Sequence, residues 1–113
     1  MATPLNVFKT VTYDVTSSNA VVYTAPTGFT GIVLMAQAAN VASTSTETIS
    51  FSHFDTSATV ETELLKNFVI PEADAASLLT GKLIIQSGDS VKAQASANST
   101  FKLTLSVLES LDA

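Results

Sequence analysis

Short segments in which apolar and polar residues alternate recur along this chain, and turn signals separate them at near-regular spacing. Residues 7–15, 91–97 and 101–107 show the alternation most clearly. A period of two places every second side chain on the same face of a β-strand. This pattern limits the fold most, because half-buried strands must pair into sheets that share a core.

Five further segments fit the same interpretation, at residues 21–25, 30–40, 48–55, 60–70 and 83–86. About eight short strands with turns between them predict an all-β antiparallel sandwich of the jelly-roll kind. An immunoglobulin-like sandwich is the alternative, although the chain has no Cys or Trp to build the core of that fold. Gly28 and Gly88 are expected to lie in hairpin turns.

Residues 72–79 are the one segment with helical character. Glu72 and Asp74 would lie in the first turn, where acidic side chains stabilise the helix dipole. We therefore expect one short helix, which forms a corner between the fifth and sixth strands.

The length of 113 residues predicts a single domain spanning residues 1–113. Residues 1–6 are expected to form a flexible N-terminal arm, because Pro4 cannot donate to a strand ladder, and residues 109–113 a flexible tail. The first residues lack the basic and apolar regions of a signal peptide. No apolar run approaches the ~20 residues of a membrane helix, so no membrane partner is expected.

The residues that usually carry chemistry are scarce. The chain has no cysteine and one histidine, His53, for which a structural role is expected. Glu61, Glu63 and Asp55 could suggest glycoside chemistry or calcium binding, but a solvated edge strand explains them better. We therefore expect no catalytic residues, metal site or cofactor, and no enzymatic activity.

Charge is low as well as acidic. The net charge is −5, and the five basic residues are lysines spread along the chain, so no nucleic-acid partner is expected. Charged residues make up 13% of the chain, against a usual share of about 25%. Ser, Thr, Ala and Asn must therefore cover much of the surface.

Several expected strands are apolar on both faces, including residues 21–23, 32–35, 68–70 and 83–85. A strand of an isolated sandwich faces water on one side, so something must cover the second face. A neighbouring subunit is one cover, and the short helix and loops of the same chain are the other. The subunit interpretation predicts a trimer or another closed oligomer. Its expected interface residues are Thr3, Pro4, Leu5, Asn6, Val33, Met35, Leu65, Ile84, Leu108 and Leu111. Some of these must be core, because neighbours in a strand face opposite ways.

Six stretches resemble, in order, a family of small virion proteins from tailed bacteriophages, including cyanobacterial phages. They are residues 22–28, 32–34, 65–71, 77–83, 86–91 and 104–109. The chain departs from the family pattern at residues 72–76, which are acidic and rich in alanine where a Gly-Ser corner is expected.

The resemblance implies a non-enzymatic β-rich structural protein located in the virion and assembled in the host cytoplasm. Within that class, a capsid cement or decoration protein that binds itself and the major capsid protein fits the composition best. A neck, tail or fibre component is the alternative within the virion. A carbohydrate-binding β-sandwich module is the alternative from another class.

Overall fold

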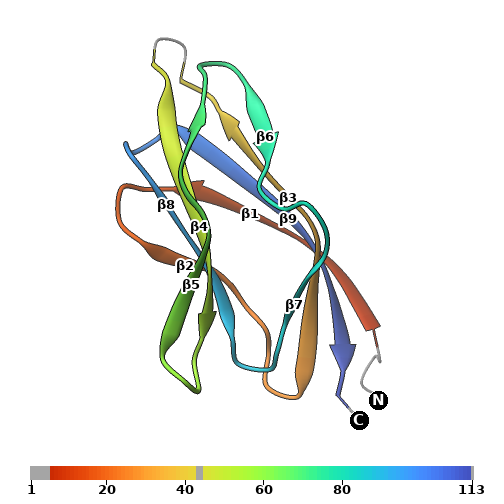
Figure 1. The fold of residues 1–113 in the computed structure, drawn as a ribbon. Coiled ribbons are helices and arrows are strands. Elements are labelled where there is room, and N and C mark those ends of the chain that lie inside the picture. The colour runs from red at the N-terminus through yellow and green to blue at the C-terminus, as the bar shows by residue number, and fades with distance from the viewer. Residues whose placement is uncertain (1–5, 43–44, 113) are drawn as a thin grey trace.

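The computed structural model describes residues 6–42 and 45–112, which form nine strands in two antiparallel sheets (Figure 1). The strands are β1 (Asn6–Val15), β2 (Ala20–Thr24), β3 (Phe29–Asn40), β4 (Glu47–Asp55), β5 (Val60–Ile70), β6 (Ala75–Ser77), β7 (Leu83–Ile85), β8 (Ser90–Ala95) and β9 (Phe101–Leu111). The described residues contain no helix, and hence none that could cross a membrane. The prediction of an all-β chain with two antiparallel sheets is therefore confirmed.

The first sheet has the strand order β1-β9-β3, and the short strands β6 and β7 pair with different parts of β3. The second sheet has the order β2-β8-β4-β5. Among the described strands, the β4–β5 hairpin and the β6–β7 connection stay within a sheet, and every other connection crosses between sheets. The turns at Gly28 and Gly88, with φ of 85° and 84°, therefore join strands of different sheets, so their prediction as hairpin turns is wrong.

The core lies between the two sheets and follows the period-two pattern. In β9, every second residue from Phe101 to Val107 is buried, and these side chains meet Ile49 and Phe51 of β4 within one hydrophobic cluster. Fully burying a side chain of this size stabilises the fold by roughly 1.5–3 kcal/mol. Burial of the apolar side chains in this alternating pattern therefore contributes strongly to the stability of the fold.

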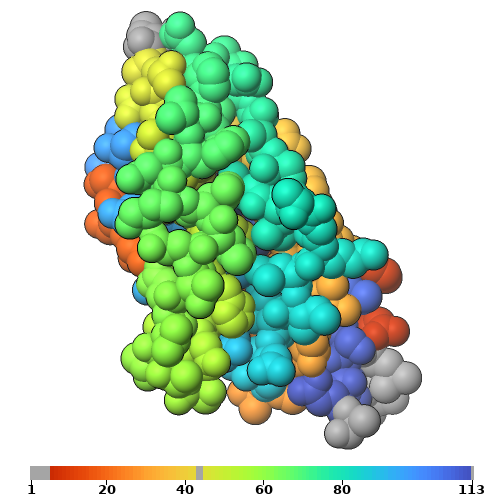
Figure 2. Space-filling model, in the orientation of Figure 1, coloured from red at the N-terminus to blue at the C-terminus, as the bar shows by residue number. Residues whose placement is uncertain are grey.

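The prediction of a helix at residues 72–79 is wrong. Ala73 has a positive φ of 58°, and Ala75–Ser77 form β6, which pairs with residues 37–39 of β3. The amide of Leu78 donates to the carbonyl of Ala36, and the Leu78 side chain is buried. Figure 2 shows the segment, in teal, beside the green β5 on the viewed face. An isolated two-turn helix is marginal in water, whereas pairing with β3 satisfies the backbone and buries Leu78.

The chain ends differ from the prediction where the structure describes them. Asn6, expected in the flexible arm, begins β1 opposite Ser110. Glu109 and Leu111, expected in a flexible tail, belong to β9. Beyond them, the Asp112 amide donates to the Gly28 carbonyl at 2.8 Å. Pairing with both β1 and β3 holds this end of β9 in the sheet.

Candidate assembly surface

A row of apolar side chains crosses the outer face of the first sheet. Phe8 of β1 lies opposite Leu108 of β9, Leu108 lies opposite Ile32 of β3, and Ile32 lies opposite Ile84 of β7. Residues directly opposite each other in a ladder point to the same side of the sheet, so the four side chains adjoin. Leucine, isoleucine and phenylalanine thus form one continuous row from one sheet edge to the other.

A β-bulge in β3 adds two residues to this row. The pairing of β3 with β9 shifts between Val33 and Met35, so that Val33 lies opposite Val107 whereas Met35 lies opposite Ser106. Val107 is a core residue and Ser106 is on the outer face, so Val33 points inward and Met35 points outward. Leu34, the extra residue, is exposed. We call the six residues Phe8, Ile32, Leu34, Met35, Ile84 and Leu108 the apolar band.

The apolar band is exposed to solvent in the isolated chain. Phe8 is 76% exposed, Ile84 61% and Leu34 37%, and the other three side chains are half-buried. A shallow hollow of about 190 Å³, lined by Phe8, Lys9, Thr10, Leu34, Ser106 and Val107, lies within it. A contiguous apolar patch of this kind on a folded protein is typical of an interaction surface.

The remainder of the outer face carries polar side chains and the small side chains of Ala39 and Ala75. Thr12, Thr104 and Gln37 continue the ladder rows beyond the hollow. At the far end, Lys102 of β9 forms an ion pair with Asp14 of β1 at 2.9 Å. The large apolar side chains of this face are thus confined to one end of the sheet.

The band contains three of the residues that the sequence predicted for an interface, namely Met35, Ile84 and Leu108. Asn6 is exposed beside the band, in the register position opposite Ser110. Leu111, 37% exposed, lies at the end of β9 opposite Phe29. Whether Asn6 and Leu111 contribute to an interface stays a prediction. Thr3, Pro4 and Leu5 lie outside the described residues.

Two other predicted interface residues lie elsewhere. Val33 is 0% exposed, so its prediction is wrong, because a fully buried side chain cannot contact a partner. Leu65 packs against the core from β5 of the second sheet.

Phe8, Ile32 and Leu34 were not among the predicted interface residues. The sequence could have indicated Phe8, because Phe8 is aromatic whereas Thr10 and Thr12, which lie on the same face of the strand, are polar. Leu34 carried no such signal, because its exposure depends on the bulge.

The outer face of the second sheet carries a different feature, a polar hollow of about 430 Å³. Its lining consists of Ser17, Asn19, Thr48, Ser50, Ser52, Glu61, Glu63, Lys66, Asn67, Gln94, Ala95 and Ser96. The Glu61 carboxylate accepts hydrogen bonds from Ser52 Oγ at 2.7 Å and Asn19 Nδ2 at 3.0 Å, and Lys92 Nζ lies 3.5 Å away. The hydrogen bond from Ser52 is the main cause that lowers the pKa of Glu61. Glu61 thus ties β5 to β4, to β8 and to the turn before β2.

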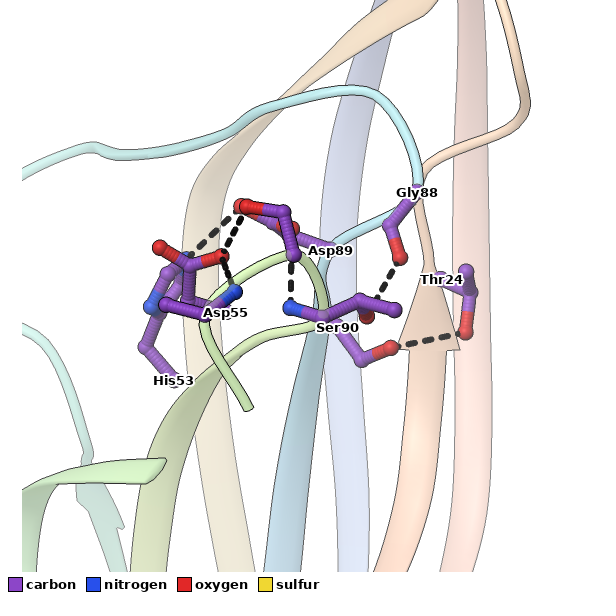
Figure 3. Close-up of polar contacts among 9 residues, drawn as sticks. Thr24, His53, Asp55, Gly88, Asp89 and Ser90 are labelled. Atoms are coloured by element: carbon purple, nitrogen blue, oxygen red, sulfur yellow. Dashed lines mark hydrogen bonds and ion pairs between the residues drawn. The ribbon is translucent and has the colours of Figure 1, made fainter. Parts of the chain in front are cut away.

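His53 and the turn at Gly88 form another polar cluster, at one end of the sandwich (Figure 3). His53 Nε2 lies 3.9 Å from Asp89 Oδ2, and the other Asp89 oxygen accepts the Thr56 amide at 3.1 Å. The Ser90 hydroxyl is 3.0 Å from that of Thr24 and has no hydrogen bond to His53. Within residues 6–42 and 45–112, no group of three or more His, Asp or Glu could hold a metal ion. The cluster fastens the loop after β4 to the turn before β8.

Comparisons with known proteins support the fold. No protein-family model matches the chain, and no curated protein matches it. A chain of the acidic stable capsid structure of Helicobacter pylori bacteriophage KHP30 superimposes with a TM-score of 0.58 at 15% identity, covering 97% of this chain and 90% of that one. A chain of the Bacillus endospore appendages, described as disulfide-linked pili, superimposes with a TM-score of 0.55 at 12% identity, covering 96% and 88%. The protein shares its fold with both.

Proposed function

We propose that this chain is a non-enzymatic structural protein of a bacteriophage virion, which assembles through the apolar band. The observation that carries the proposal is the exposed row of Phe8, Leu108, Ile32 and Ile84 across one sheet face. A surface with few charges and a continuous apolar band suits a protein that packs into a larger assembly. The phage resemblance of the sequence and the fold shared with a phage capsid chain support the virion as that assembly.

We infer further that the sandwich is a jelly roll. β6 and β7 both pair with β3, so we count them together as the sixth of eight strands. The first strand (β1) then pairs with the eighth (β9), and the second (β2) with the seventh (β8). The third (β3) pairs with the sixth (β6 and β7), and the fourth (β4) with the fifth (β5). The eighth also pairs with the third, and the seventh with the fourth. These pairings are those of a long hairpin rolled into two interlocked Greek keys, an architecture common in viral capsid domains.

Within the virion, we favour a capsid cement or decoration protein that binds its own copies and the major capsid protein. Trimers or other closed oligomers are the assembly that identical subunits most often form. A neck, tail or fibre component would use the same band on a different neighbour. Fibre assembly through disulfides, as in the endospore pili, is excluded for this chain because it has no cysteine.

A second candidate function, binding of a carbohydrate, is supported by the polar hollow of the second sheet. Its hydroxyl, amide and carboxylate groups match the donors and acceptors of a polyhydroxylated ligand. The nearby Phe54 ring is covered by Lys92, whose Nζ lies 5.1 Å from the ring centroid, so it offers no open stacking platform. Calorimetric titration with neutral oligosaccharides tests this candidate, and an absence of heat at millimolar ligand rejects it.

The apolar band is tested by charge substitution. Phe8→Asp and Ile84→Asp change exposed side chains, so we expect both variants to fold. They should lose binding to capsid shells of the phage that encodes the chain, because an unpaired buried charge is costly at an interface. Gln37→Asp adds the same charge to the polar part of the same face and should behave as wild type.

The position in the virion follows from copy number. Quantitative mass spectrometry of purified particles should find hundreds of copies for a head protein, and a few to a few dozen for a neck or tail component. A wild-type chain that stays monomeric at high micromolar concentration and binds no shells would reject the cement proposal.

A further inference from the structure

The backbone edges of the two sheets differ in how well they are protected. A strand at a sheet edge presents unpaired N–H and C=O groups that can pair with another chain, and folded proteins usually blunt such edges. The edges here are β1 and the β6–β7 pair in the first sheet, and β2 and β5 in the second. Comparing them shows where an additional strand could pair.

Three of the four edges are blunted. β6 and β7 have three residues each, and β2 has five with a register shift. β5 is long, but its register shifts twice and Asn67 has a positive φ of 50°. Glu61, Glu63 and Lys66 also place charges along β5. Short length, bulges and edge charges are all features that prevent strand addition.

β1 lacks the first two of these protections, because it is neither short nor bulged. It pairs with β9 through ten consecutive residues without a register shift, and it contains no proline. Its two charged side chains already have partners in their own chain, Lys9 with Glu109 at 3.1 Å and Asp14 with Lys102 at 2.9 Å. On its other side, β1 has no backbone hydrogen-bond partner within the described residues. β1 is therefore the long, regular and open edge of this fold.

We propose that β1 pairs antiparallel with β1 of a second copy of this chain, around a two-fold axis that passes next to Thr10. An axis perpendicular to the sheet relates two identical antiparallel strands and makes the interface self-complementary. The first sheets of the two copies then join into one continuous sheet. This pairing names the mode of self-association and does not depend on the virion assignment.

The register follows from the side chains that each choice opposes. With Thr10 opposite its own copy, Phe8 faces Thr12 of the second copy, and Lys9 faces Val11. Threonine pairs and aromatic pairs with β-branched residues stabilise neighbouring strands. Centring the pair on Lys9 would oppose two lysines, and centring it on Val11 would oppose Phe8 to Asp14, both of which are unfavourable.

The pairing also brings the two apolar bands to the same face of the joined sheet. Because Phe8 of one copy lies opposite Thr12 of the other, the bands are offset by four residues, or about 14 Å along the strands. The dimer thus presents a larger surface to a third protein than one chain does.

A single-cysteine variant tests the register, because the natural chain has no cysteine to interfere. Opposed residues in an antiparallel pair have Cα atoms about 4.5–5.5 Å apart, within the range that a disulfide spans. We therefore expect Thr10→Cys to form a covalent dimer under mild oxidation. Thr12→Cys, two positions off the axis, and Thr62→Cys, on the bulged edge β5, should stay largely monomeric on reducing-agent-free gels.

A charge variant tests the edge without crosslinking. Thr10→Lys places two ammonium groups opposite each other and should shift the sedimentation profile from dimer to monomer, whereas Thr62→Lys should leave the dimer intact. Circular dichroism checks that both variants fold. A wild-type monomer in sedimentation, or equal crosslinking of Thr10→Cys and Thr62→Cys, would overturn the proposal. If Thr10→Cys still crosslinks when it is combined with Ile84→Asp, the β1 contact forms independently of the apolar band.

Discussion

At the scale of single residues, the most constrained group is a buried polar cluster that joins the two sheets. The Tyr23 hydroxyl of β2 donates to Glu109 Oε2 at 2.6 Å, and Lys9 Nζ lies 3.1 Å from the other carboxylate oxygen. Glu109 is only 3% exposed, so these two partners take the place of water around its carboxylate. Burial, followed by the hydrogen bond to Glu109, raises the pKa of Tyr23 well above its usual range, which keeps the hydroxyl protonated as a donor.

The ring of Tyr23 fits only because residue 31 is a glycine. A Cβ at Gly31 would lie 2.9 Å from Tyr23 Oη and 3.0 Å from a ring carbon. We expect Gly31→Ala to destabilise the fold by roughly 1–3 kcal/mol, because it displaces Tyr23 from Glu109. Urea unfolding measures this loss.

Gly81→Ala is the matched control for this prediction. Nothing lies within 4 Å of a Cβ at Gly81. Its free energy of unfolding should equal or slightly exceed that of wild type, since alanine restricts the unfolded chain. Equal stability of Gly31→Ala and wild type would show that Tyr23 can move without cost.

At the scale of elements, the segment between β5 and β7 shows where local signals fail. Acidic residues after Pro71 favour a helix locally, yet Ala75–Ser77 complete the edge of β3 instead. The pairing is set by β3, nearly forty residues earlier in the chain, and no local pattern reports it. By contrast, all eight predicted strands exist, because alternation or short apolar runs between turn signals identify strands locally.

The apolar band could be predicted from the sequence only in part. Met35 and Ile84 stood out because apolar residues occupied both faces of their segments, whereas Leu108 was expected to reach a neighbour as the start of the C-terminal tail. Val33 and Met35 were assigned together because strict alternation puts residues two apart on one face. The bulge at Leu34 breaks that alternation and sends the two side chains to opposite faces, and residues 32–37 contain no glycine or proline to reveal it.

A glycine substitution distinguishes the observed turn from the predicted helix. Ala73 has a φ of 58°, a conformation that costs non-glycine residues about 1–2 kcal/mol. Ala73→Gly should therefore keep or raise the melting temperature. In a helix the same change would lower stability by about 1 kcal/mol.

Ala75→Gly, within β6, provides the comparison for Ala73→Gly. It should lower stability by roughly 0.5–1 kcal/mol, because glycine loses more freedom in a strand. A larger loss for Ala73→Gly than for Ala75→Gly in calorimetry would contradict the strand assignment.

At the scale of the whole molecule, both sheets expose apolar side chains: the band lies at one end of the first sheet, and Phe68 and Val69 are exposed on β5 of the second sheet, which also presents a polar hollow. The two proposed contacts, through the band and through β1, both require the folded chain. Association that involves only the folded state stabilises it by mass action. Stability should therefore depend on protein concentration.

Differential scanning calorimetry measures this dependence. The melting temperature of wild type should rise as its concentration increases from micromolar to hundreds of micromolar. A variant that combines Thr10→Lys with Ile84→Asp should melt at one temperature throughout. A wild-type melting temperature independent of concentration would argue against both contacts.

The pairing of the first strand with the last also governs when the fold can appear. β9 lies between β1 and β3, so the first sheet lacks its central strand until residues 101–111 have left the ribosome. Until then, β1 and β3 both lack β9, the strand that pairs with each of them, and their apolar residues stay exposed. Because such distant pairings form slowly, folding during translation must wait for the final strand. A nascent chain stalled before β9 should thus be recognised by chaperones as unfolded.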